Sequence, residues 1–258
     1  MTTPEPTVRA GRLADAPALH ALWVQAFRGS TLPFTVHADP RSVAWLAEVL
    51  GRQPPAVGVL DAGGHLSGAF EGALVDRDWH LAHVAVRADT RGQGLGRRLL
   101  AGFEGWGRDR GASTFSLHVV EAKPDVAAWY ARHGYRVEGR RVHLLLDVPG
   151  TAARAATFAL AQPALDQALA SVSARGFGRL AAWRGEQRLE VGLLGDDACR
   201  LLDPGDLSVE EAVAELRALF AGSRSRLVLV GQPREPRVDG VLESWPALRM
   251  QKQADDLR

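Results

Sequence analysis

Hydrophobic residues in the first 148 positions switch repeatedly between the runs typical of strands and the three- and four-residue spacing of amphipathic helices. Helical spacing begins after Asp15 and after the Asp39-Pro40 pair, and it recurs at 93–110 and 125–133. Strand-like runs cover 8–10, 56–60, 66–74, 81–86, 114–119, 135–137 and 142–148. An antiparallel hairpin around 61–65, followed by alternating helices and strands, predicts an α/β fold of the α+β type. We expect a mixed, mostly antiparallel central sheet flanked by helices.

A second, shorter set of elements follows a turn-rich boundary at 149–153. The apolar pattern predicts strands at 179–183, 188–193, 198–202, 226–230 and 248–251, and a helix that Ser208 caps. This order repeats that of the first half from its hairpin onward, at an offset of roughly 110 to 116 residues. We therefore expect two domains, residues 1–148 and 149–258, the second being a smaller α/β domain and a degenerate copy of the first.

The stretch from Trp79 to Arg98 combines a strand, a polar turn and a glycine-rich entry into a helix, Arg91-Gly92-Gln93-Gly94-Leu95-Gly96. Backbone N–H groups in the first turn of a helix lack partners and carry partial positive charge. Glycines let a phosphate approach these groups without a side chain in the way. The stretch is therefore compatible with a pyrophosphate cradle, although an ordinary strand-to-helix connection would have the same pattern.

Two motifs together make the interpretation more specific. The pattern Arg-x-x-Gly-x-Gly follows a strand that ends Val84-Ala85-Val86, and the segment 129–135, Trp-Tyr-Ala-Arg-His-Gly-Tyr, comes about thirty residues later. In these motifs the chain resembles the GNAT superfamily of acyl-CoA-dependent N-acetyltransferases, over roughly residues 8–148. The resemblance implies acetyl-CoA as co-substrate. It also implies direct attack on it, in a ternary complex, by a primary amine of a small molecule or peptide.

The resemblance also implies which residues bind the co-substrate. The strand residues Val84, Ala85 and Val86 would form main-chain hydrogen bonds to its pantetheine arm. The pyrophosphate would be held by Arg91, Gly92, Gln93, Gly94, Leu95, Gly96 and Arg97. At Lys123 the chain departs from the asparagine that the family often has, and lysine cannot accept the hydrogen bonds that an asparagine accepts.

Two catalytic residues follow from the same resemblance. Tyr130 matches the family's tyrosine whose hydroxyl protonates the departing thiolate, although it could instead be a packing residue of an amphipathic helix. His80 matches the position of a catalytic base, and its alternative is a hydrogen-bonded sheet histidine. His83 is an odd number of residues from His80, so in a regular strand the two would face opposite ways and at most one would lie in the site. We expect His83 to be structural.

Acceptor binding is expected in the loop between the first two helices, where the resemblance implies roles for Phe34 and His37. The alternative is that Phe34 anchors the loop and that His37 is a solvated histidine. The second domain would close over the acceptor site or form a dimer interface. It should not bind coenzyme A, because Asp206, Glu210 and Glu211 lie where the first copy has Arg91 and glycines.

Composition excludes several other classes of function. The net charge is +1, and no basic stripe with interleaved aromatic residues appears, so we expect no nucleic-acid partner. Cys199 is the only cysteine, which excludes an intrachain disulfide and a cysteine-based metal cluster, and no metal is expected. There is no apolar run of about 18 residues and no leader-like start, so we expect a soluble cytoplasmic protein without membrane contact.

Two other functions stay open at this point. A non-catalytic acyl-CoA-binding or sensing protein would suit the additional domain. A two-unit acyltransferase resembling mycothiol synthase, whose acceptor is a thiol-sugar conjugate, would suit the degenerate repeat.

Overall fold

The computed structural model describes residues 6–29, 33, 35–62 and 64–256, and the chain divides into two compact units. The first unit comprises Met1–Ser30, Leu46–Arg140 and Ala247–Arg258. The second unit comprises Thr31–Trp45 and Arg141–Pro246. The division therefore differs from the predicted boundary after residue 148, because residues 31–45 belong to the second unit and the end of the chain belongs to the first.

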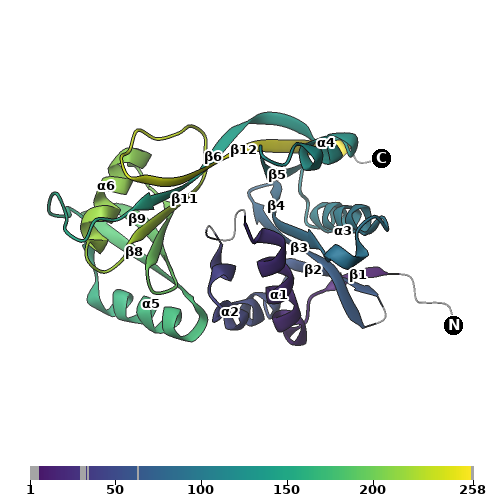
Figure 1. Ribbon diagram of the computed structural model, residues 1–258, viewed down its shortest axis with the longest axis horizontal. Coiled ribbons are helices and arrows are strands. Elements are labelled where there is room, and N and C mark those ends of the chain that lie inside the picture. The colour runs from purple at the N-terminus through teal and green to yellow at the C-terminus, as the bar shows by residue number, and fades with distance from the viewer. Residues whose placement is uncertain (1–5, 30–32, 34, 63, 257–258) are drawn as a thin grey trace. The chain divides into compact units, whose positions relative to one another are not determined.

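The first unit is built on a mixed sheet whose strands follow the order β1-β2-β3-β4-β5-β12. Its elements are β1 (Thr7–Ala10), α1 (Ala16–Phe27), β2 (Val57–Ala62), β3 (His65–Val75), β4 (Asp78–Val86), α3 (Leu95–Asp109), β5 (Thr114–Val120) and α4 (Pro124–Arg132). Helix α1 packs on β3 and β4 from one face, and α3 packs on β2, β3 and β4 from the opposite face (Figure 1). This is the fold class that the sequence predicts.

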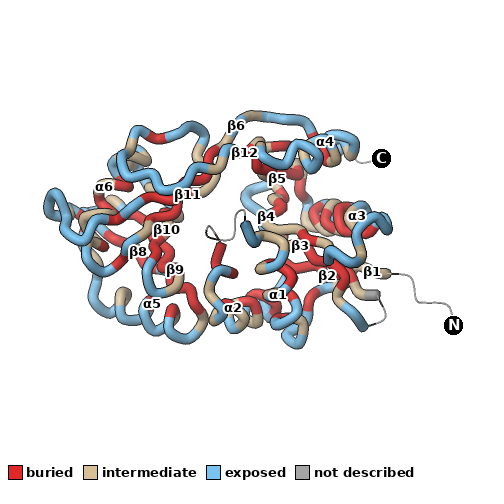
Figure 2. The backbone as a smooth tube through the Cα atoms, viewed as in Figure 1, coloured by how far each residue is buried: buried red, intermediate tan, exposed pale blue. Residues whose placement is uncertain are grey.

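The core between α3 and the sheet sets the direction of this helix. Leu95, Leu99 and Phe103 are buried on the inner side of α3 and form one apolar cluster with Trp79 of β4. Buried positions recur along α3 and the strands of this sheet (Figure 2). The indole nitrogen of Trp79 donates a hydrogen bond to the Phe103 carbonyl at 3.0 Å. Burying each such side chain contributes roughly 1.5–3 kcal/mol, so the start of α3 is held firmly beside the end of β4.

No described helix is both long and apolar enough to cross a membrane.

The second unit repeats the pairing pattern of the first. Its elements are β7 (Ala159–Leu160), α5 (Gln162–Arg175), β8 (Phe177–Arg184), β9 (Gln187–Leu194), β10 (Ala198–Asp203), α6 (Val209–Phe220) and β11 (Arg226–Gln232), with the sheet order β6-β11-β10-β9-β8-β7. The β8–β9 and β9–β10 pairs are antiparallel, and α6 connects β10 to a parallel β11. The first unit has the same sequence of pairings from β2 to β5, with α3 as its connection.

Three elements differ from the sequence prediction. Helix α5 was not predicted because its apolar side is weak, with only Ala168 and Val172 buried. The runs expected at 135–137 and 142–148 form one continuous strand, β6 (Arg136–Asp147). The last strand, β12 (Val241–Gln253), is much longer than the expected 248–251.

Each sheet includes a strand from the other half of the chain. Residues 142–147 of β6 pair with β11 in the second unit, from Gln232↔Val142 to Arg226↔Asp147. Residues 247–253 of β12 pair antiparallel with β5 in the first unit, from Ala247↔Val120 to Gln253↔Thr114. This exchange explains why the units do not follow a single cut in the sequence.

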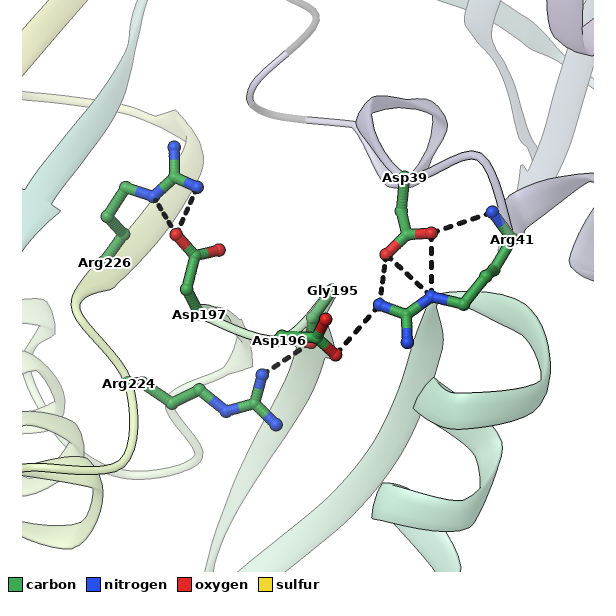
Figure 3. Close-up of polar contacts among 7 residues, drawn as sticks. All are labelled: Asp39, Arg41, Gly195, Asp196, Asp197, Arg224 and Arg226. Carbon is green, nitrogen blue, oxygen red and sulfur yellow. Dashed lines mark hydrogen bonds and ion pairs between the residues drawn. The ribbon is translucent and has the colours of Figure 1, made fainter.

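The segment 31–45 belongs to the second unit because Asp39 and Arg41 anchor it there (Figure 3). Arg41 Nη2 bonds Asp39 Oδ2 at 2.6 Å and Asp196 Oδ1 at 2.9 Å. The Asp39 carboxyl lies over Gly176, where a Cβ would come within 2.8 Å of its Cγ. Arg224 also contacts the turn that contains Asp196, because it donates a hydrogen bond to the Gly195 carbonyl at 2.6 Å. The start of α2 (Ser42–Leu50) follows directly from this anchor.

We predict that Gly176→Ala lowers the free energy of unfolding by about 2 kcal/mol more than Gly185→Ala, measured by urea denaturation. Both glycines have positive φ, +73° and +60°, so backbone strain is matched, but only a Cβ at Gly176 meets another residue. In an Asp39→Gly background, which removes the Asp39 Cβ as well as the carboxyl, the difference between the two substitutions should largely vanish. Equal effects of both substitutions in the wild-type background would contradict the role of Gly176 as the seat of Asp39.

Candidate active site

The start of α3 is an uncapped helix terminus. Gly92 and Gly94 have φ of +78° and +76°, and no side chain caps the helix. Within the described part of the chain, the backbone N–H groups of residues 92–96 have no backbone acceptor. A Cβ at Gly92 or Gly94 would meet nothing within 4 Å. The open N–H groups and the helix dipole together form a site that suits an anion.

The equivalent helix start in the second unit is closed. Ser208 caps α6, and its hydroxyl oxygen accepts a hydrogen bond from the Glu211 N–H at 3.2 Å. The Glu211 carboxylate in turn accepts the Ser208 N–H at 2.9 Å, which completes a capping box. Side chains of the protein itself therefore occupy the position that α3 leaves open.

Strand β4 separates from β5 halfway along its length. Parallel pairing runs from Asp78↔Thr114 to Leu81↔Leu117 and goes no further. Residues 84–86 still pair with β3 on their other side. Among the described residues, no strand pairs with the β5-facing edge of β4 beyond Leu81, so main-chain groups there are available to a ligand.

A bulge at the same point changes which side chains share a face. His83 pairs with Glu71 and Leu81 pairs with Gly72, so Ala82 has no partner on β3. The prediction that His80 and His83 face opposite ways is therefore wrong, because the extra residue restores both imidazoles to the face that α1 covers.

His83 packs against two aromatic side chains and one carboxylate on this face. Its ring lies 5.6 Å from that of Trp23 and 5.1 Å from that of Phe27, both on α1. Its Nδ1 lies 2.8 Å from a Glu71 carboxylate oxygen. Contacts of this kind also occur in a structural histidine, so the expected structural role of His83 stays a prediction.

His80 ends a chain of hydrogen bonds across β4 and β5. The Ser116 hydroxyl donates to Asp78 Oδ2 at 2.6 Å, and its oxygen lies 2.9 Å from His80 Nδ1. Because the serine proton is directed at the carboxylate, His80 Nδ1 must be the donor to Ser116. The tautomer therefore carries its free lone pair on Nε2.

The environment keeps His80 neutral. Burial lowers the pKa of His80, Arg249 and His83 lower it further, and Asp78 opposes them. A neutral imidazole with a free Nε2 can accept a proton at neutral pH.

The sequence analysis did not identify three residues that lie around His80, namely Ser116, His118 and Arg249. Arg249 of β12 pairs with Asp78 at 3.2 Å and with Glu138 at 2.7 Å. The His118 ring lies 5.1 Å from that of His80. The polar alternation of Ser116 and His118 in an otherwise apolar strand was a signal for a functional face, whereas the contribution of Arg249 depends on the exchanged strand.

Tyr130 lies in the apolar core of the first unit, on α4. Its ring packs 4.9 Å from that of Trp129, and a Cβ at Gly96 would lie 3.7 Å from the Trp129 indole. This packing places α4 beside the first turn of α3. Burial raises the pKa of Tyr130, so the phenol stays protonated.

Phe34 and His37 are the two residues that the sequence resemblance assigns to acceptor binding. Phe34 lies outside the described residues. The His37 ring lies 5.8 Å from that of Trp45, which belongs to the same unit. Its role in acceptor binding stays a prediction.

A mixed sheet with a parting between β4 and β5, helices on both faces and an open helix start after β4 together form a fold of the GNAT type. Residues 17–135 match the model of the acetyltransferase (GNAT) family, so the chain contains a GNAT acetyltransferase domain. No curated protein matches the chain in sequence.

Solved structures show the same fold over the whole chain. A candidate acetyltransferase from Pyrococcus horikoshii aligns with a TM-score of 0.64 and 15% identity, covering 98% of this chain and 91% of its own. A GCN5-related N-acetyltransferase from Sphaerobacter thermophilus aligns with a TM-score of 0.62 and 16% identity, covering 98% and 97%. One from Kribbella flavida reaches a TM-score of 0.56 at 16% identity, covering 97% and 72%.

We predict that His80 titrates below the ordinary value of about 6.5 and that Ser116→Ala lowers its pKa further. The imidazolium would lose the hydrogen-bond chain to Asp78 that stabilises its charge. Histidine side-chain NMR titration measures both values, and the His80→Gln spectrum assigns the signal. A pKa above 6.5, or nitrogen shifts of the Nε2-protonated tautomer, would contradict the proposed chain.

Proposed function

We propose that the chain transfers an acetyl group from acetyl-CoA to a primary amine of a small molecule or a peptide, by direct attack in a ternary complex. The observation that carries this proposal is the open, glycine-lined start of α3 next to the unpaired edge of β4. An anion site and an extended backbone edge at one end of one strand match a ligand with a pyrophosphate and an amide-containing arm.

In this proposal, the backbone N–H groups of residues 92–96 bind the pyrophosphate. Arg91 and Arg97 are exposed beside them, and no ion pair ties either one to another described residue. Both guanidinium groups are therefore available for charge-assisted hydrogen bonds to phosphate oxygens. Val84, Ala85 and Val86 would pair through their main chain with the amides of the pantetheine arm.

His80 Nε2 is the proposed acceptor for the proton that the amine nitrogen loses when it attacks the thioester carbonyl. As the new C–N bond forms and the C–S bond breaks, Tyr130 would donate its phenolic proton to the departing sulfur. Burial raises the pKa of Tyr130, so the phenol is protonated at rest, and in this proposal its proton moves to the sulfur as negative charge develops there. The imidazolium and the phenolate then return to their starting states by exchange with water.

The repeated pairing pattern of the second unit favours one further candidate, a two-unit acyltransferase resembling mycothiol synthase. The closed start of α6 supports one acyl-CoA site per chain in either case, because the Glu211 carboxylate and Ser208 would oppose a phosphate there. A screen of amine acceptors, with detection of released thiol, distinguishes turnover from simple acyl-CoA binding.

We predict that Gly94→Val weakens acetyl-CoA binding at least tenfold in calorimetric titration, because a branched side chain would block the approach to the open N–H groups. Gly111→Val is the matched control, since Gly111 has a φ of +74° and equally open surroundings at the other end of α3. Normal binding by the Gly94 variant would refute the cradle. Equal losses in both variants would indicate backbone strain rather than a binding site.

We predict that Tyr130→Phe retains acetyl-CoA affinity and lowers kcat by about 10- to 100-fold, because the leaving thiolate loses its proton donor. Tyr135→Phe provides the control, because Tyr135 is a core residue of the same cluster. Stopped-flow or steady-state assays of thiol release give kcat, and titration gives the affinity. Unchanged turnover in the Tyr130 variant would show that another group protonates the sulfur.

A further inference from the structure

One face of the second unit's sheet carries two arginines in a single row. Gly192 of β9 pairs with Arg200 of β10 on one side and with Arg179 of β8 on the other. Directly paired residues of neighbouring strands point to the same face, so the two side chains flank a residue that has none. Their Cα atoms lie about 10 Å apart, two strand spacings, which long arginine side chains can bridge.

This face lies opposite the helices α5 and α6. Cys199 and Leu201 pack into the apolar cluster that includes residues of both helices, so Arg200 between them points the other way. Its surroundings there are largely apolar, since Ala198, Phe177 and Val228 form a separate buried cluster on that side.

Arg200 has no anionic partner in the described structure. Its Nε is buried and has no hydrogen-bond partner there. Burial lowers the pKa of Arg200 to about 10, and the charge of Arg179 adds to this effect. Arg200 as a whole is half-buried, and holding its charge partly out of water without a counter-charge costs stability, which a fold rarely retains without a reason.

The groups around Arg200 do not supply the missing charge. Glu190, on the same face of β9, is occupied by an ion pair with Arg188 at 2.7 Å. His143 Nδ1 accepts the Gly231 N–H at 3.3 Å, and burial followed by the Arg200 charge lowers the pKa of His143 to about 4. This histidine is therefore neutral at pH 7 and cannot balance the arginine.

Arg179 offers the second half of a binding pair. It is exposed and lies over the Phe177 ring at 5.7 Å, which holds the guanidinium plane against the sheet. We infer that Arg200 and Arg179 together bind a carboxylate or phosphate group of a small molecule on this face of the second unit. A bound oxyanion would supply the counter-charge for Arg200 and accept hydrogen bonds from both guanidinium groups.

The test is thermal unfolding in an anion-poor buffer, with inorganic phosphate or succinate added at constant ionic strength and chloride as the reference. We expect the wild type to gain about 3 °C in Tm with phosphate or succinate. Arg200→Met should raise Tm by about 2 °C without an anion, because a partly buried charge without a counter-charge is removed, and should lose the response to both probes. Arg184→Met, at an exposed position on the opposite face of β8, should keep the response.

Which probe binds tells whether phosphate or carboxylate is preferred, and either result supports the site. A lower Tm for Arg200→Met without an anion, or a wild type that responds to neither probe, would overturn the inference. Acetyl-CoA titration of Arg200→Met separates the two proposals, because its affinity should match that of the wild type. Failure of the wild type to bind acetyl-CoA, with an intact anion response, would refute the proposed function alone.

Discussion

Strand β5 is held by β12 along its whole length but by β4 along only four residues, and the site of the first unit depends on this difference. Without β12, the second half of β5, which β4 does not pair with, would expose its main-chain groups on both sides. Because β12 supplies antiparallel partners from Thr114 to Val120, β5 stays ordered while β4 turns away after Leu81. The same strand delivers Arg249 to Asp78, which orients the Ser116 and His80 pair.

Most of the first unit could be predicted from sequence because its signals are local. The amphipathic period of α3, the glycines before it and the strand ending at Val86 are each contained in a few residues. The arrangement of β12 could not be predicted, because nothing within 247–253 specifies pairing with a strand more than a hundred residues earlier. Likewise, the bulge at Ala82 is a property of the β3–β4 register, and alternation alone put His83 on the wrong face.

Residues 31–45 belong to the second unit although the residues on both sides of them in the sequence belong to the first, and a small set of contacts accounts for this. This segment lies between two helices of the predicted first domain, yet the Asp39 carboxyl packs over Gly176 and reaches toward Gly195, both with positive φ. Larger residues could not adopt that backbone without strain or allow the carboxyl so close. The chain between α1 and α2, where the family places acceptor contacts, is thus part of the second unit.

The two units share a pairing pattern but differ in where polar groups lack partners. In the first unit, these groups are the backbone N–H groups at the start of α3, whereas in the second the equivalent groups are capped by Ser208 and Glu211. The second unit has an unpartnered donor elsewhere among its described residues, at Arg200 on the sheet face. Native folds rarely leave buried or preorganised donors unused, because each one costs stability that a ligand can restore. Two units with the same pairing pattern therefore differ in where a polar group is left without a partner, at the start of a helix in one and on the face of a sheet in the other.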